Sequence, residues 1–195
     1  MDKPRVLFLV LPNQSWDGHL VSMATPHLPT ASLAAYLREK GVECRAEDLS
    51  LRWRNRREAI GRLVAQFQPH FVGMSVYSQT AHAAEEAYRL LRAASPVPAI
   101  FGGPHISVDG ERFLAGKENV VGVRGDGWQT LWDLVRGAAG IKGQVIEGAP
   151  TNDLDSLPWP DWKLFEKDAY REWESGTYTI VTSRGCPFGC SFCAA

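Results

Sequence analysis

The feature that most constrains the fold of this chain is a fivefold alternation between short apolar runs and segments with helical periodicity. The strands are expected at residues 5–11, 42–48, 71–76, 99–101 and 120–123, and the helical segments lie at 30–41, 55–68, 81–94, 109–115 and 128–137. All of these strands except 42–48 are short apolar runs. Short, nearly continuous apolar runs are typical of strands buried on both faces of a sheet. The alternation therefore predicts an α/β fold with a five-stranded, doubly wound parallel sheet and helices on both sides.

The connections between these strands and helices predict where a ligand would bind. Right-handed crossovers bring all strand-to-helix loops to the edge formed by the carboxyl ends of the strands, and open α/β sheets bind their ligands there. In this chain those loops cover residues 12–29, 77–80, 102–107 and 125–128. Thr30 is expected to cap the helix that follows the first of them.

Composition and charge narrow the class of protein. Apolar residues make up 45% of the chain and charged residues 22%, as in globular proteins of the aqueous phase. A net charge of −1 gives no electrostatic reason to expect a nucleic acid or a membrane as partner. No apolar run approaches the ~18 residues of a membrane helix, and the opening residues do not resemble a signal peptide. We expect a cytoplasmic protein.

Three of the four cysteines, Cys186, Cys190 and Cys193, stand in one stretch with the spacing Cys-x3-Cys-x2-Cys, whereas Cys44 is isolated. This distribution does not suit a disulfide framework. Three thiolates on one loop can hold three irons of a [4Fe–4S] cluster and leave the fourth iron open to a chelating ligand such as S-adenosylmethionine. Zinc is the rival metal, but a closed zinc site needs a fourth ligand and is usually built from two separated pairs.

The stretch 182–193, which contains these cysteines, resembles the opening of the radical S-adenosylmethionine superfamily. The segment 154–162 is similar to the linker that joins an N-terminal cobalamin-binding domain to the radical barrel, and Gly102-Gly103-Pro104-His105 and 123–127 fit the same architecture. The resemblance to cobalamin-dependent radical S-adenosylmethionine enzymes covers essentially the whole chain. It implies a Rossmann- or flavodoxin-like cobalamin-binding domain at 1–140, an interdomain linker at 141–176, and at 177–195 the first strand (177–183) of a radical (β/α) barrel that the chain does not continue.

The same resemblance implies three cofactors: a [4Fe–4S] cluster, S-adenosylmethionine and cobalamin. It assigns the cluster to the three clustered cysteines and the adenine of S-adenosylmethionine to Phe192. Glycines in the edge loops let backbone approach a flat corrin closely, and nearby hydroxyls can bond its nucleotide tail. The residues expected to contact cobalamin are Ser75, Ser78, Thr80, Gly102, Gly103, Pro104, His105, Gly125 and Asp126.

A histidine in the first edge loop is a candidate for the lower cobalt ligand. Asp17-Gly18-His19 nearly matches the Asp-x-His-x-x-Gly motif of many cobalamin domains, but Ser22 stands in place of the glycine and the following helix is delayed. We therefore expect no cobalt ligation by His19.

The implied function is that of a radical methyltransferase, which splits S-adenosylmethionine into methionine and a 5'-deoxyadenosyl radical and methylates an unactivated carbon from methylcobalamin. The alternative is a radical enzyme of other outcome, such as cyclisation or methylthiolation, whose first domain is a scaffold without cobalamin. Expected partners are a small-molecule or natural-product substrate and an electron donor such as flavodoxin or ferredoxin. No catalytic residue can be named, and we expect no turnover from these 195 residues alone.

A non-catalytic receiver domain would share the sheet but is excluded by its chemistry. A receiver needs an acidic pair after the first strand, an aspartate after the third and a lysine after the fifth. This chain has Pro12-Asn13, 75–77 without an acid, and Arg124-Gly125 at those places.

Overall fold

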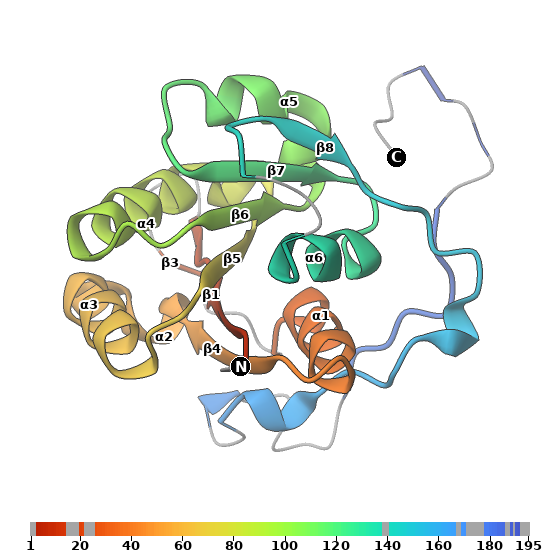
Figure 1. The fold of residues 1–195 in the computed structure, drawn as a ribbon, viewed down its shortest axis with the longest axis horizontal. Helices are drawn as coiled ribbons and strands as arrows, with labels where there is room; N and C mark the ends of the chain where they lie inside the picture. Colours follow the sequence, from red (N-terminus) through yellow and green to blue (C-terminus); the bar gives the residue numbers. More distant parts are fainter. Residues whose placement is uncertain are drawn as a thin grey trace.

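The computed structural model describes residues 3–14, 20–21, 26–137, 141–166, 169–170, 178–185, 188 and 190–191. Its centre is a sheet of six parallel strands (Figure 1). In spatial order these are β4 (Glu43–Asp48), β1 (Arg5–Val10), β5 (Phe71–Ser75), β6 (Ala99–Gly102), β7 (Val120–Arg124) and β8 (Val145–Glu147). The predicted doubly wound parallel sheet is confirmed.

The prediction of five strands is wrong by one, because β8 lies in the segment assigned to the linker. This edge strand pairs with β7 in parallel, from Val145 opposite Gly122 to Glu147 opposite Arg124. It has only three residues, half-buried or exposed, so it lacks the long apolar run that marks the inner strands. The sheet therefore continues past residue 140.

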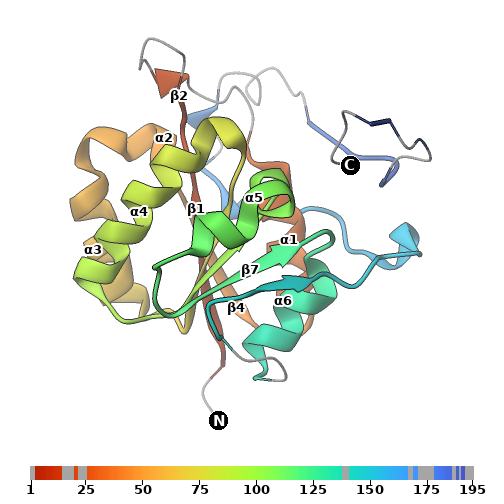
Figure 2. The same cartoon turned by 90° about the horizontal axis from the view of Figure 1, so that it is seen from above.

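Helices cover both faces of the sheet (Figures 1 and 2). They are α1 (Leu28–Glu39), α2 (Leu49–Arg52), α3 (Arg56–Phe67), α4 (Ala81–Ala94), α5 (Pro104–Leu114) and α6 (Trp128–Val135). Short 3₁₀ turns lie at η1 (Trp53–Asn55), η2 (Ser78–Thr80), η3 (Leu154–Ser156) and η4 (Trp162–Leu164), and β2 (Asn13–Gln14) pairs antiparallel with β3 (Leu20–Val21). No helix in the described part of the chain is both long and apolar enough to cross a membrane.

Alternate residues of the inner strands face two separate cores. Leu7 and Leu9 of β1 pack with α3, α4 and α5, whereas Val6 and Phe8 pack with α1 and α6. This alternation makes the domain a three-layer sandwich, because a strand that is apolar on both faces must be covered on both.

Two helices begin earlier than the sequence pattern predicts. The cap of α1 is His27, whose side chain accepts a hydrogen bond from the Thr30 backbone, so the prediction of Thr30 as cap is wrong. α5 begins at Pro104 rather than at 109, because proline suits the first turn of a helix. Its dihedrals are non-helical at Asp109 (φ −133°, ψ 29°), where the sequence pattern started the helix.

The segment after β8 packs against the domain through η4, beside α1 and β4 (Figure 1). The Asp161 backbone donates to the Ala31 carbonyl at 3.1 Å, and the Asp161 carboxylate pairs with Arg38. Tyr170 is buried and its hydroxyl donates to Asp48 Oδ2 at 2.8 Å. The segment assigned to the linker therefore shares a core with the first domain.

The expected strand at 177–183 is absent from its described residues, 178–183, and that prediction is wrong for them. Tyr178, Ile180 and Val181 are all more than half exposed. A strand is stabilised by hydrogen bonds to a neighbour, and no described strand pairs with these residues.

The carboxyl ends of β5 and β6 are locked together at Gly103. The Val76 backbone donates to the Gly102 carbonyl at 2.7 Å, and the His105 backbone donates to the Val76 carbonyl at 3.0 Å. Gly103 has φ +92° and ψ 173°, a region open almost only to glycine. A Cβ there would lie 2.7 Å from the Val76 carbonyl oxygen.

We expect Gly103→Ala to lower the free energy of unfolding by about 3 kcal/mol or more, through strain and steric overlap together. Gly116→Ala is the matched control, because Gly116 also has positive φ (+73°) but nothing within 4 Å of its added Cβ. That variant should lose only about 1 kcal/mol. Urea denaturation of both variants measures the difference. Equal losses of unfolding free energy would contradict the steric role of Gly103 between β5 and β6.

Candidate functional site

The strand order reverses direction at β1, which lies between β4 and β5. In doubly wound sheets a crevice opens at such a point, outside the carboxyl ends of the strands. The loops after β1 and β5 flank it, and β2 of the first loop contacts η2 of the second. The predicted cobalamin contacts lie at the carboxyl ends of β5, β6 and β7 and in the residues that follow them, up to the start of α5.

The loops after β5 and β6 bring two predicted polar residues together. Ser78 Oγ and His105 Nδ1 lie 3.4 Å apart, with Ser78 exposed and His105 half-buried. Ser75 pairs with Gly102 in the sheet register, and Pro104 is exposed at the start of α5. Ser78 and His105 therefore offer a hydroxyl and an imidazole to a ligand at the edge.

Thr80 has a different position from the other predicted contacts. It is buried, and its hydroxyl accepts from the Tyr77 backbone N–H at 2.9 Å and donates to the Tyr77 carbonyl at 3.1 Å. Thr80 thus shapes the loop from inside. This geometry does not favour its predicted hydrogen bond to a nucleotide tail.

Glycines leave bare backbone at the ends of β6 and β7. A Cβ at Gly102 would have the Val123 carbonyl oxygen as its nearest neighbour at 3.8 Å, and one at Gly125 would have that of Gly148 at 3.9 Å. Both are ordinary contacts, so neither position is filled by another part of the chain. Bare backbone beside exposed polar groups fits a large flat ring with a polar rim.

The loop after β7 holds an acid, and the helix after it begins with an indole; the polar groups of both are bonded within the chain. Asp126 Oδ1 pairs with Arg184 at 2.7 Å, and Asp126 Oδ2 accepts from the Thr151 backbone at 2.9 Å. Trp128 Nε1 donates to Ser32 Oγ at 3.1 Å, and the Arg184 guanidinium lies 5.2 Å from the Trp128 ring. Both carboxylate oxygens of Asp126, predicted to contact cobalamin, are thus bonded within the chain, one of them to the arginine two residues before Cys186.

The predicted metal ligands are only partly described. Cys190 is exposed, whereas Cys186, Cys193 and Phe192 lie outside the described residues, as do Asp17 and His19. Within the described ranges no three histidine, cysteine or acidic residues form a group that could hold a metal ion. The cluster assignment therefore stays a prediction.

The isolated cysteine has the properties of a core residue. Cys44 lies on β4 and is 2% exposed. Burial raises the pKa of its thiol to about 12, so it is protonated at neutral pH. A protonated, buried thiol is a poor metal ligand.

A residue that the sequence analysis missed is His27, at the start of α1. It is 9% exposed, its Nδ1 accepts from the Thr30 backbone and lies 2.8 Å from Thr30 Oγ1, and its ring meets that of Tyr77 edge-on at 6.2 Å. His27 thereby joins the loops after β1 and β5. Burial lowers its pKa to about 4, so the ring is neutral at pH 7. Pro29, in the first turn of α1, was the available sequence signal for this helix start.

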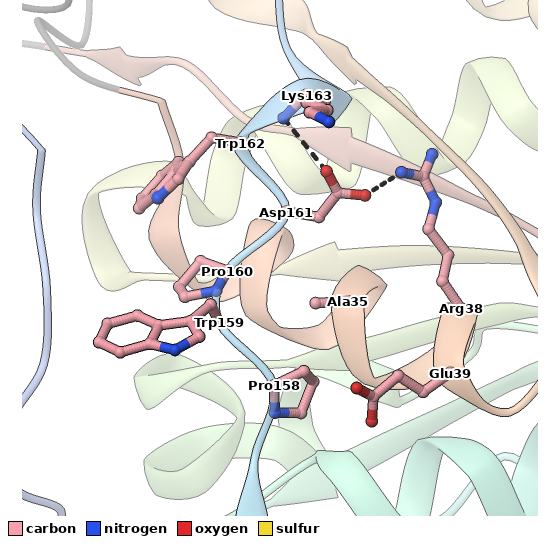
Figure 3. A pocket seen from close by; sticks show the side chains of 9 residues that line it. All are labelled: Ala35, Arg38, Glu39, Pro158, Trp159, Pro160, Asp161, Trp162 and Lys163. Carbon is pink, nitrogen blue, oxygen red and sulfur yellow. Dashed lines mark hydrogen bonds and ion pairs between the residues drawn. The ribbon is translucent and has the colours of Figure 1, made fainter.

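A shallow open groove lies elsewhere, between the second half of α1 and residues 158–163 (Figure 3). Asp161 crosses it, bonded to Arg38 and to the Lys163 backbone. Trp159 at its rim is 85% exposed. The groove does not include any predicted cobalamin contact.

Comparison with known proteins gives a family match and curated relatives. The B12 binding domain model matches residues 21–135. An uncharacterized methyltransferase of Pyrococcus horikoshii is 27% identical, over 98% of this chain and 45% of that protein. The anaerobic magnesium-protoporphyrin IX monomethyl ester cyclase of Rubrivivax gelatinosus is 26% identical, over 97% of this chain and 38% of the cyclase. The chain thus spans less than half the length of these relatives.

Two solved structures share the fold. One is the radical S-adenosylmethionine methyltransferase TsrM from Kitasatospora setae with cobalamin and a [4Fe–4S] cluster bound (TM-score 0.56, 22% identity, 68% of this chain, 24% of that chain). The other is the cobalamin-dependent S-adenosylmethionine radical enzyme OxsB with aqua-cobalamin and S-adenosylmethionine bound (TM-score 0.58, 21% identity, 70% of this chain, 19% of that chain). At these identities the likeness concerns the fold alone.

The buried His27 predicts a loss of stability in acid. Its folded-state pKa of about 4 lies below the ordinary 6.5, so the unfolded state binds more protons between these values and stability falls as pH drops through that window. The loss from pH 7 to 4.5 is roughly 2 to 3 kcal/mol. His27→Asn keeps a capping side chain but removes the titration, so its unfolding free energy should depend less on pH. Parallel pH profiles from urea denaturation would contradict this account.

Proposed function

This chain belongs to the B12-binding domain family, and we propose that it binds cobalamin at the carboxyl edge of its sheet as part of a radical S-adenosylmethionine enzyme. The observation that carries the proposal is the edge itself. Bare backbone lies at Gly102, the last residue of β6, and at Gly125, directly after β7, and the exposed Ser78 and half-buried His105 lie 3.4 Å apart at the same edge. The cysteine motif begins two residues after Arg184, which is bound at the same edge.

The residues of this edge would divide the binding of a corrin between them. Gly102 and Gly125 let the ring lie against backbone without a side chain between. Ser78 and His105 would bond the polar groups of its rim, and Ser75, at the end of β5, would bond the nucleotide tail. His27 and Thr80 hold the neighbouring loops in place from inside.

We assign the [4Fe–4S] cluster to Cys186, Cys190 and Cys193 and the adenine of S-adenosylmethionine to Phe192. When bound, the cluster supplies the electron that splits S-adenosylmethionine, and cobalamin supplies a methyl group. Three cysteines leave one iron open for S-adenosylmethionine. The buried, protonated Cys44 does not compete for iron.

Methyl transfer to an unactivated carbon is the reaction we favour, and the methyltransferase names of the Pyrococcus horikoshii relative and of TsrM support it. Ring formation is the second candidate, supported by the Rubrivivax gelatinosus cyclase, which matches nearly the whole chain. The net charge of −1 favours a small-molecule or natural-product substrate over a nucleic acid or membrane surface. Flavodoxin or ferredoxin in the cytoplasm would donate the electron.

Cobalamin retention tests the first half of the proposal. After mixing with hydroxocobalamin and desalting, the protein should keep about one corrin per chain. Gly102→Leu should abolish retention, because its side chain would enter the space where the ring lies. Gly61→Leu is the matched control, since Gly61 lies on α3 with nothing within 4 Å of an added Cβ. If the wild type keeps no corrin absorbance, the domain is a scaffold and cobalamin binding is refuted.

Iron content tests the second half. After anaerobic reconstitution, replacing any one of Cys186, Cys190 or Cys193 by Ala should remove most of the bound iron and sulfide. Cys44→Ala should keep both, because that thiol is only 2% exposed in the core of the domain. Equal losses in Cys44→Ala, or binding of zinc in place of the cluster, would contradict the assignment.

A further inference from the structure

Arg184 connects the cysteine motif to the carboxyl edge of the sheet. Its Nη2 lies 2.7 Å from Asp126 Oδ1, and its guanidinium lies over the Trp128 ring at 5.2 Å. Asp126 follows β7, and Trp128 is the first residue of α6. We call these three residues the clasp. It joins positions 58 residues apart in the sequence, at the edge assigned to cobalamin.

The domain fixes the receiving half of the clasp. The second oxygen of Asp126 accepts from the Thr151 backbone at 2.9 Å, and the indole N–H of Trp128 donates to Ser32 Oγ at 3.1 Å. The Asp126 side chain is 16% exposed and that of Arg184 is 45% exposed. The Asp126 carboxylate and the Trp128 ring are therefore held by other bonds of the domain, whereas the more exposed Arg184 side chain binds to them.

Arginine suits this position better than lysine would. Its planar guanidinium can pair with a carboxylate at its edge while its face stacks on an aromatic ring. Gly185 follows with φ +74° and nothing within 4 Å of an added Cβ. The chain thus turns in the left-handed region directly after the clasp, one residue before Cys186.

We propose that Asp126 is a positioning residue, which holds Arg184 and Gly185, the residues directly before the cysteine motif, at the edge assigned to cobalamin. This inference rests on the proposed function for its purpose, but the clasp can be tested without either cofactor. It changes the role of Asp126 from a cobalamin contact to an anchor for the cluster loop. An exposed ion pair alone contributes little free energy. The stacking of Arg184 on Trp128 and the fixed orientation of the Asp126 carboxylate add to the stability of the clasp.

Trypsin cleavage after Arg184 reports opening of the clasp in the cofactor-free chain. Trypsin must take the guanidinium into its own pocket, so it cuts only when Arg184 has left Asp126, and the rate follows the open population. Asp126→Asn removes the charge but keeps an oxygen for the Thr151 N–H. We expect about two- to fivefold faster cleavage after Arg184, measured by mass spectrometry.

Two further variants separate this effect from general loosening. Asp126→Glu keeps the charge and should restore slow cleavage. Glu147→Gln removes the carboxylate that pairs with Arg124 at 2.7 Å on the neighbouring strand, and it should leave cleavage after Arg184 unchanged. Equal rates in wild type and Asp126→Asn would overturn the proposal, and so would an equal acceleration in Glu147→Gln.

Bound cobalamin gives a second readout, since a corrin quenches a nearby fluorophore. A dye is placed on Cys190 in a Cys186→Ser, Cys193→Ser background, where buried Cys44 stays unlabelled. Asp126→Asn should weaken the quenching while cobalamin retention stays the same. Loss of retention to the extent seen in Gly102→Leu would make Asp126 a cofactor contact and overturn the proposal. If the wild type binds no corrin, the proposed function fails, and the trypsin comparison still decides on the clasp.

Discussion

Parallel pairing of strands that are apolar on both faces is the constraint on which the rest of this structure depends. Such strands need a layer of helices on each side, and each connection must cross from one edge of the sheet to the other. All loops after the strands therefore meet at the carboxyl edge. Residues from β5, β6 and β7, distant in the sequence, become neighbours there. The position of the candidate site therefore follows from the topology of the sheet and does not depend on which side chains line it.

Two features that cost stability hold this edge in one conformation. Gly103 adopts a conformation that other residues avoid, and it brings the start of α5 within hydrogen-bonding distance of the loop after β5. His27 is buried as a neutral ring between the loops after β1 and β5. Both features restrict the loops before a ligand arrives. A preset edge loses less conformational entropy when a large cofactor binds.

Some of this could be predicted from the sequence and some could not, for physical reasons. The four inner strands carry apolar runs that are visible without a structure, and the edge strand β4 was predictable from its place between two helical segments. The edge strand β8 is short and half-exposed, and the pattern carries no signal for it. The contact of His27 with Tyr77 and the bond between Asp126 and Arg184 both join residues that are distant in the sequence, so they depend on the folded path of the chain. The cysteine motif could be recognised in the sequence because its three cysteines lie within eight residues of one another.

Hydrogen–deuterium exchange with and without hydroxocobalamin tests most directly whether the carboxyl edge is the cobalamin face. We expect slower exchange on cobalamin binding in peptides that cover residues 76–80, 102–107 and 125–128. Peptides at the opposite edge, at 41–43, 68–70 and 117–119, should exchange at unchanged rates. Protection confined to the groove at residues 158–163, or no protection at the carboxyl edge while corrin is bound, would contradict it.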